Sequence, residues 1–465
     1  MRRIQILALC ALAACGTSGV APERQRERPN FVVVFIDDMG YADLSCFGGE
    51  EAETRHIDRL AREGITFRQF YVNSPICSPS RVAISTGQYP QRWRISSYLA
   101  HREKNESRGM ASWLDPAAPM LARTLSEAGY ATGHFGKWHM GGQRDVGDAP
   151  QIGEYGFEES LTNFEGLGPR VLPMLEAYDG SEARPHALGS DRLGSGPVVW
   201  EERALVTRSF TRAAIDFIRK TQEEGRPFYV NLWPDDVHSP FFPPAELRGD
   251  GSKRARYHGV LTRMDEDLGE LFDLLRGDEG LRDNTLVLLC SDNGPEKGAG
   301  SAGRLRGFKT HLFEGGIRSP LVVWGPGRVK PGDNTESVLS AMDLVPSLLA
   351  LAGLRPSVAL DGEDLSDVLT GASKRSRQSP LYFRRPPDRD SYYGVKDLPD
   401  LAVREGSWKL TTEFDATATA LYDLDQDPGE TRDVADLHPE LVRRLLEGLL
   451  AWDREMPPDA GDPSR

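Results

Sequence analysis

The sequence of 465 residues contains only five cysteines. Two of them, Cys10 and Cys15, lie near the N-terminus, which leaves Cys46, Cys77 and Cys290 for the rest of the chain. So few thiols exclude the disulfide framework that stabilises small secreted domains. One Cys46–Cys290 bridge stays open, although Cys290 lies in an apolar run and is more simply interpreted as a small buried residue.

The chain also lacks an excess of basic residues, since its formal net charge is −14. Nucleic-acid binding needs a basic face, so we expect no nucleic-acid partner. A net negative charge also repels anionic substrates, and any anion site must therefore be locally basic. No internal repeat is evident, and a composition of 39% hydrophobic and 27% charged residues is typical of a globular protein with a sizeable core.

The N-terminal apolar run, at 4–14, is too short to span a bilayer. It follows two arginines, which is typical of a signal peptide. Residues 12–15, Leu-Ala-Ala-Cys, resemble the bacterial lipoprotein box, in which cleavage leaves a lipid-modified cysteine. We expect a signal peptide at 1–14, a lipidated Cys15 that anchors an exported protein at the periplasm or cell surface, and a polar tether at 16–28. An ordinary signal peptide is the alternative.

Beyond the tether, β-branched and aromatic runs alternate with helical patterns. The runs predict strands at Phe31–Ile36, Tyr130–Gly136, Phe228–Trp233, Thr285–Cys290 and Leu321–Trp324. Helices are predicted at His56–Glu63, Met120–Ala128, Ser209–Glu224, Tyr257–Leu275 and Asp343–Ala352. This alternation predicts an α/β fold, with a large, mostly parallel sheet covered by helices on both faces. Residues 160–200 show no clear period and are expected to form a long insertion.

The composition changes after Gly371, where we place a domain boundary. Short antiparallel strands are predicted beyond it, at Leu381–Arg384, Leu401–Arg404, Trp408–Glu413 and Leu421–Leu424, before a helix at about His438–Trp452. We therefore expect a main domain at 29–371 and a smaller C-terminal α+β subdomain at 379–456.

Polar clusters follow four of the predicted strands. They are Asp37-Asp38, Lys137-Trp138-His139, Asp235-Asp236-Val237-His238 and Ser291-Asp292-Asn293-Gly294. Ligands of such sheets gather outside the carboxyl ends of the strands. One cluster alone would be a capped loop, but four together indicate a shared site.

The stretch from Cys77 to Arg81 adds a possible reactive group. Pro79 fits the first turn of a helix, which places Cys77 at or beside a helix N-terminus that favours an anion. Arg81 lies four residues on and can share a face with Cys77. A buried structural cysteine and a surface arginine would give the same pattern, so this stretch needs support from the rest of the chain.

Taken in order, these motifs resemble the formylglycine-dependent (type I) sulfatases of the alkaline-phosphatase-like superfamily. The resemblance rests on the segments 33–40, 77–87, 136–141, 238–240, 291–294, 307–309 and 314–318. It covers nearly the whole chain after the tether. Phe308 departs from the pattern, because small residues are frequent there in the relatives.

The resemblance implies that Cys77 is oxidised to formylglycine, by a formylglycine-generating or an anaerobic sulfatase-maturating enzyme. It also implies a divalent ion, Ca²⁺ rather than Mg²⁺, held by Asp37, Asp38, Cys77, Asp292 and Asn293. The residue chemistry agrees, because carboxylate and amide oxygens suit these hard cations. Adjacent acids at a buried strand end would also repel each other without a cation.

Catalytic roles are implied for Cys77 and five further residues. Lys137 and Lys309 would contact the sulfate, and Arg81 would hold the formylglycine hydrate. His139 would take the proton of that hydrate, and His238 would protonate the leaving alcohol as general acid.

The expected substrate is a sulfated carbohydrate, a polysaccharide or glycosaminoglycan fragment. Candidates for its recognition are Arg92, Trp93, Arg94, His101, Arg102, Asp235, Asp236 and the 160–200 insertion with His186, although a solvated loop is the simpler interpretation for any one of these residues. Two alternatives stay open. One is a phosphonate or phosphate monoester hydrolase that uses the same formylglycine, and the other is a non-catalytic sulfoglycan-binding lipoprotein.

Overall fold

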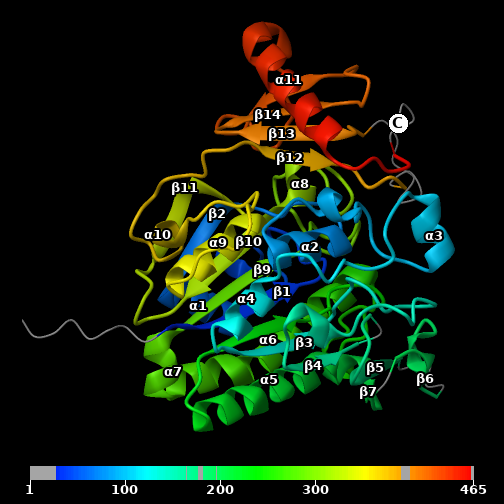
Figure 1. The fold of residues 1–465 in the computed structure, drawn as a ribbon, viewed down its shortest axis with the longest axis vertical. Coiled ribbons are helices and arrows are strands. Elements are labelled where there is room, and N and C mark those ends of the chain that lie inside the picture. Colours follow the sequence, from blue (N-terminus) through cyan, green and yellow to red (C-terminus); the bar gives the residue numbers. More distant parts are fainter. Residues whose placement is uncertain (1–27, 164, 176–181, 195, 389–397, 462–465) are drawn as a thin grey trace, which may run out of the picture.

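The computed structural model describes residues 28–163, 165–175, 182–194, 196–388 and 398–461 (Figure 1). The expected signal peptide, Cys15 and the tether up to residue 27 lie outside these residues. Within the described ranges, no helix combines the length and the apolar character that a membrane span requires.

Eleven strands form the main sheet. They are β1 (Asn30–Ile36), β2 (Ile65–Tyr71), β3 (Ala131–Gly136), β4 (Glu159–Thr162), β5 (Arg170–Leu175), β6 (Arg184–Pro185), β7 (Val198–Glu202), β8 (Phe228–Trp233), β9 (Thr285–Ser291), β10 (Arg318–Trp324) and β11 (Gly332–Ser340). Their order is β11-β2-β10-β9-β1-β8-β3-β4-β5-β6, with β7 paired to β5. The central strands β9, β1, β8, β3 and β4 are parallel, whereas β10 is antiparallel to both of its neighbours. The expected mostly parallel sheet is confirmed.

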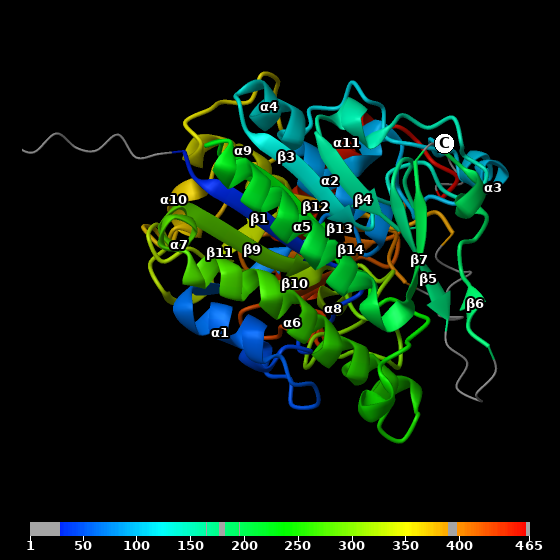
Figure 2. The same cartoon turned by 90° about the horizontal axis from the view of Figure 1, so that it is seen from below.

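Alternate residues of β1 enter two separate hydrophobic cores, because successive side chains of a strand point to opposite faces. Phe31, Val33 and Phe35 join the core under α2 (Cys77–Thr86), α4 (Leu121–Glu127), α9 (Ala341–Leu351) and α10 (Ser366–Leu369). The intervening residues, Val32, Val34 and Ile36, join the core under α1 (Arg55–Glu63), α5 (Val206–Glu223), α6 (Lys253–Gly277) and α7 (Glu279–Asn284). Figure 2 shows α5 and α6 lying across this second face. Both faces are therefore covered, as expected.

The C-terminal part forms a separate antiparallel sheet of four strands. These are β12 (Leu381–Arg384), β13 (Leu401–Glu405), β14 (Trp408–Thr412) and β15 (Ala420–Asp423), and α11 (Pro439–Glu455) lies beside them at the top of Figure 1. One hydrophobic cluster joins them to Tyr71 of β2 and Ala83 of α2. The α+β character is confirmed, whereas the boundary after residue 371 stays a prediction.

Several strands were not expected from the sequence. β2 contains Arg68 and Gln69, which are only half-buried, and this obscures its apolar pattern. β11 is largely exposed over its first half. The expectation of an irregular insertion at 160–200 is wrong in part, because β5 and β7 of this segment pair in parallel and extend the main sheet.

The structure contains no Cys46–Cys290 bridge, since Cys46, Cys77 and Cys290 are all free thiols. Cys290 is fully buried in β9, which confirms the simpler interpretation of this residue.

A buried ion cluster connects the C-terminal sheet to the segment that precedes β10. Lys409 of β14 lies 3.1 Å from Glu314 and 2.8 Å from Glu430, and all three side chains are fully buried. Such charges are tolerated because each is compensated by a neighbour of opposite sign. The cluster therefore makes the position of Glu314 depend on the C-terminal sheet.

We predict that Lys409→Met lowers the free energy of unfolding by about 3–5 kcal/mol, because it removes the cation that two buried carboxylates share and leaves only Arg318 and the more distant Arg404 beside Glu314. Chemical denaturation measures this change. The control is Arg443→Met, which removes an exposed ion pair of α11 and should leave the denaturation midpoint unchanged. Equal midpoints for both variants and the wild type would contradict the assigned role of the cluster.

Candidate active site

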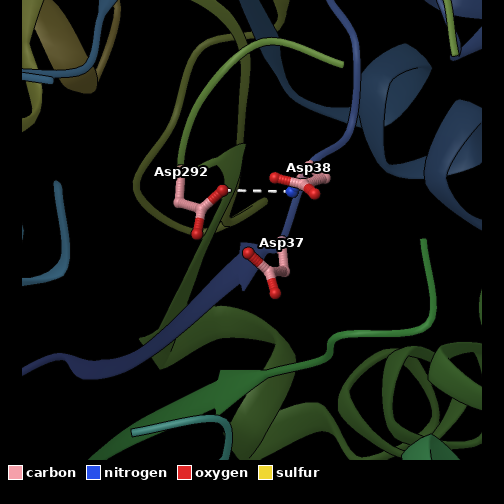
Figure 3. A group of neighbouring side chains, drawn as sticks. All are labelled: Asp37, Asp38 and Asp292. Carbon is pink, nitrogen blue, oxygen red and sulfur yellow. Dashed lines mark hydrogen bonds between the residues drawn. The ribbon is translucent and has the colours of Figure 1, made fainter. Parts of the chain in front are cut away.

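Three carboxylates meet at the carboxyl ends of two neighbouring strands. Asp37 and Asp38 follow β1, and Asp292 follows β9. Ligand oxygens of the three lie within 4.8 Å of one another, and the side chains are fully buried. Figure 3 shows them facing a common centre, with the Asp38 amide donating a hydrogen bond of 3.1 Å to Asp292. The structure thus brings together the three acids that the sequence placed at separate strand ends.

Three cations from three other segments surround these acids. Arg81 of α2 donates to Asp292 at 2.8 Å and lies 3.4 Å from Asp37. Lys137, directly after β3, donates to the other oxygen of Asp37 at 2.6 Å. Lys309 donates to Asp38 at 2.7 Å. Three carboxylates and three cations give a formal charge of zero (−3 + 3), so the site can be buried.

The surrounding charges shift the pKa values of Asp37 and Asp292 in opposite directions. Burial alone would raise the pKa of Asp37, but Lys137, His238, Arg81 and Lys309 together hold this pKa well below its usual range. Burial and the negative charge of Asp37 raise the pKa of Asp292 well above its usual range. Like charges this close cannot all persist without additional positive charge. Asp292 therefore tends to keep its proton in the protein alone, and a cation bound among the three acids would lower its pKa.

The donor set fits a hard divalent ion. Asn293 donates to Asp38 at 2.7 Å, while its own Oδ1 and the Oδ1 of Asp37 are buried and have no hydrogen-bond partner among the residues that the structure describes. Buried polar atoms are rarely left unsatisfied. Three carboxylates and an amide oxygen match the ligands of Ca²⁺ or Mg²⁺. The residues present thus suit the expected ion.

Glycines let the backbone close around this cluster. A Cβ added to Gly294, next to Asn293, would lie 1.9 Å from the carbonyl oxygen of Gly315. A side chain at this position would push apart the two segments that carry Asn293 and Glu314. The close approach explains why glycine follows the asparagine in this motif.

Cys77 is the first residue of α2, as expected from Pro79, and it opens onto a cavity of about 340 Å³. The lining residues include Tyr98, Lys137, His139, Arg144, Glu165, His186, Leu188, His238 and Lys309. Burial raises the pKa of the Cys77 thiol to about 12, although Lys137 and Lys309 oppose this. A thiolate nucleophile is therefore disfavoured, and the helix N-terminus does not overcome burial here.

The two histidines differ in their surroundings. Nε2 of His139 lies 3.1 Å from the Leu99 carbonyl oxygen, and Nδ1 lies 3.2 Å from Glu165. His238 is half-buried, with Nε2 3.8 Å from Asp38. Burial lowers the pKa of both histidines. The positive charge of Lys137 lowers the pKa of His139 further, and that of Lys309 lowers the pKa of His238 further. Both rings are therefore mainly neutral at pH 7 unless an anion binds beside them.

Most of the residues named as candidates for substrate recognition lie elsewhere. Of these named residues, only His186 lines the cavity. Arg92 pairs with Asp361, Arg102 with Asp148, Asp235 with Arg203, and the side chain of His101 accepts a hydrogen bond from the Lys104 amide. The ring of Phe308 lies 4.0 Å from that of His311, and Phe308 is absent from the described cavity wall.

Sequence reasoning missed Tyr98, Arg144 and Glu165, which do line the cavity. They lie in irregular segments, where neither a strand end nor a hydrophobic period marks a position. The only sequence signal near Glu165 is its place within the glycine-rich 160–200 segment.

Comparison with known proteins now assigns the family. The sulfatase profile matches residues 29–354, and the profile of the C-terminal region of N-sulphoglucosamine sulphohydrolase matches residues 307–452. The chain belongs to the sulfatase family. It is a type I sulfatase of the alkaline-phosphatase-like superfamily, and the fold and the family both agree with the resemblance seen in its motifs.

Named relatives include enzymes of animals and bacteria. This sulfatase is 33% identical to human arylsulfatase A, over 94% of its own length and 89% of that protein. It is 30% identical to N-acetylgalactosamine-6-O-sulfatase of Bacteroides thetaiotaomicron, over 91% and 93% of the two chains. Among solved structures, a sulfatase from the glycosaminoglycan metabolism of the same bacterium has a TM-score of 0.72 and 26% identity, covering 92% of this chain and 99% of that one.

We predict that Ca²⁺ raises the melting temperature of this sulfatase and that Asp292→Asn loses this effect, because the substitution takes one charge from the buried donor set. A ligand at 100 times its dissociation constant stabilises a protein by about 2.7 kcal/mol. The measurement is the melting temperature with excess Ca²⁺ and with chelator. The wild type and the surface control Asp333→Asn should show a Ca²⁺-dependent difference that Asp292→Asn lacks. A difference of the same size in Asp292→Asn would contradict the ligand assignment.

Proposed function

We propose that this sulfatase removes sulfate from a sulfated carbohydrate, a polysaccharide or glycosaminoglycan fragment, with formylglycine made from Cys77 and a bound Ca²⁺. The main support is the cavity that Cys77 shares with Lys137, Lys309, His139 and His238. Cys77 is poor as a thiol nucleophile in this place, because its pKa is raised by burial. The names of the relatives, among them N-acetylgalactosamine-6-sulfatases, support a sulfated sugar as substrate.

The charge of the site supports an anionic substrate. The three buried carboxylates and the three cations cancel, so a divalent ion would leave an excess of two positive charges, or of one where Glu165 of the same cavity is ionised. This local positive charge would attract an anionic sulfate group, although the chain as a whole carries a net negative charge. Asp37, Asp38, Asp292, Asn293 and residue 77 would hold the ion, which would supply charge neutralisation for the sulfate oxygens. Mg²⁺ fits the same oxygen ligands but demands a more regular geometry, and Ca²⁺ is therefore preferred.

The hydrated aldehyde of formylglycine would supply the nucleophilic oxygen that attacks sulfur. Arg81 holds the first turn of α2 in place, since it binds Asp292 and also the Lys137 carbonyl oxygen at 2.9 Å. Lys137 and Lys309 each donate to an acid of the cluster and also line the cavity, so their ammonium groups would contact sulfate oxygens there. These contacts orient the sulfate against residue 77.

The two histidines would manage protons on either side of the sulfur. His139, in the state in which its Nδ1 carries no hydrogen, would accept the proton released at residue 77. His238, at the outer part of the cavity, would donate a proton to the leaving alcohol oxygen. Its lowered pKa makes it a strong acid once protonated, and an anionic sulfate beside it favours protonation.

A phosphonate or phosphate monoester hydrolase is the competing proposal, because it would use the same formylglycine. A phosphonate monoester hydrolase from Silicibacter pomeroyi shares the fold, with a TM-score of 0.63 and 22% identity over 92% of this chain and 96% of that one. Rates with an aryl sulfate, an aryl phosphate and a phosphonate diester separate the two proposals. A preference for phosphorus would overturn the sulfatase proposal. Membership of an enzyme family disfavours the non-catalytic binding protein.

Export and maturation complete this proposal. A signal peptide at residues 1–14 and a lipid anchor at Cys15 would place the enzyme in the periplasm or at the cell surface, where sulfated polysaccharide fragments are met. A formylglycine-generating or anaerobic sulfatase-maturating enzyme would act on Cys77 before folding, since the folded protein buries this side chain to 2% exposure.

We predict that Cys77→Ala and Cys77→Ser both abolish turnover while the melting temperature stays near that of the wild type. Serine keeps the size and a hydroxyl but carries no aldehyde, which makes it the matched variant. Mass spectrometry of the wild-type peptide should show the aldehyde in place of the thiol. Turnover by Cys77→Ala, by a Cys77→Ser variant whose mass shows an unmodified serine, or by a wild type that carries only thiol would contradict formylglycine.

We predict that His238→Gln lowers kcat/KM for a sulfated sugar by roughly 100-fold or more, because general acid catalysis contributes about 10²–10⁴-fold. An aryl sulfate with an acidic phenol needs little protonation of its leaving group and should be affected much less. The ratio of the two losses is measured by steady-state kinetics. Equal losses on both substrates would show that His238 acts in binding rather than as an acid.

A further inference from the structure

Glu165 is a buried acid within the cavity that the proposed mechanism does not use. Its side chain is 7% exposed, and the other ionisable groups of the cavity wall are mostly cations or histidines. Its backbone is tied to the segment after β3, since the His139 amide donates to the Glu165 carbonyl oxygen and the Gly166 amide donates to that of Gly142. Glu165 is thus held against the segment that carries Lys137 and His139.

The hydrogen-bond partners of His139 determine which of its two ring nitrogens carries a hydrogen. The Leu99 carbonyl oxygen, 3.1 Å from Nε2, can only accept, so Nε2 carries a hydrogen. Leu99 is itself fixed by its amide, which donates to the hydroxyl of Ser78 at 2.9 Å. In the neutral ring Nδ1 is therefore the nitrogen that can gain a proton.

Nδ1 of His139 faces Glu165. The distance from Nδ1 to Oε2 is 3.2 Å, and apart from this contact neither atom has a hydrogen-bond partner among the described residues. Two proton acceptors so close together in a buried place repel each other unless a proton lies between them. The same carboxylate oxygen lies 3.7 Å from Nζ of Lys137. Glu165 therefore contacts both residues that the proposed mechanism uses beside residue 77.

We infer that Glu165 is a positioning residue that shares one proton with Nδ1 of His139, so that the two side chains hold protons as a unit. This inference rests on the proposed sulfatase reaction only for its kinetic consequence. The proton moves between Oε2 and Nδ1 without any other bond changing. The carboxylate compensates the repulsion that Lys137 exerts on an imidazolium, and the shared proton keeps the ring from rotating away from the cavity.

The surrounding charges place the titration of this pair near neutrality. Burial raises the pKa of Glu165 to about 7. The negative charge of Asp37 adds to this increase, whereas the positive charges of Lys137, Arg81 and Arg144 oppose it. Burial and Lys137 hold the pKa of His139 well below its usual range. Below about pH 7 the pair therefore holds the shared proton, and it loses this proton as the pH rises. His139 without Glu165 would stay neutral throughout.

The test uses Glu165→Gln in the purified enzyme, because glutamine keeps the shape and can donate to Nδ1 but cannot release that proton. Carboxylate partners of metal-binding histidines contribute about 10- to 100-fold to activity, and we expect a similar factor for the partner of His139. We expect kcat to fall by that factor with KM within about twofold, since Lys137 stays bound to Asp37. Glu159→Gln, which removes an acid of β4 paired with Lys220, is the matched control and should equal the wild type. An unchanged kcat for Glu165→Gln would overturn the inference.

A second readout does not depend on activity. In ¹⁵N spectra of the nine histidines, His139 is assigned by its loss in His139→Gln. We expect its Nδ1 signal to titrate near pH 7 in the wild type and to stay constant from pH 6 to 8 in Glu165→Gln. Identical titrations would overturn the inference. If the wild type lacked sulfatase activity, the proposed function would fail while these spectra still decided the role of Glu165.

Discussion

The active site depends on one electrostatic constraint: three carboxylates are buried together and must be balanced from outside their own strands. Asp37, Asp38 and Asp292 come from the adjacent strands β1 and β9, whereas the balancing cations come from α2, from the end of β3 and from the loop before α8 (Glu314–Ile317). An unbalanced charge in this place would cost several kcal/mol. The fold therefore has to bring five segments together before any of these side chains can be buried.

This constraint explains which parts of the site could be predicted. The central strands are continuous apolar runs, and residues just after a parallel strand must meet at one edge, so Asp37, Lys137 and Asp292 could be placed together from the sequence. β2 and β11 could not be found, because their half-buried or exposed positions hide the apolar period. The place of Glu165 in the site could not be predicted either. Its place depends on backbone contacts with the segment after β3, and nothing in the local sequence encodes them.

Residues at the site also adopt backbone conformations that are costly elsewhere. Asp38, His139 and Thr310, next to Lys309, have positive φ angles of 61°, 51° and 75°. Such conformations cost about 1–3 kcal/mol each in a non-glycine residue and persist only where the surroundings enforce them. Here hydrogen bonds enforce them: the Asp38 amide donates to Asp292, the His139 amide to the Glu165 carbonyl oxygen and the Thr310 amide to the Pro75 carbonyl oxygen. These strained backbone conformations thus arise because side chains from three segments have to be directed into one site.

The C-terminal sheet belongs to the same system of supports. Glu430 accepts a hydrogen bond from the Glu314 amide at 2.6 Å through its side chain and one from Arg306 at 3.0 Å through its backbone. These two partners flank Lys309 on either side in the chain. Lys409 in turn neutralises Glu314 and Glu430. Lys309 therefore reaches Asp38 from a loop whose two ends are held by the smaller sheet, and loosening that sheet would move a cation of the active site. For this reason the smaller sheet acts as part of the catalytic unit, and its separation after residue 371 would not leave a working main domain.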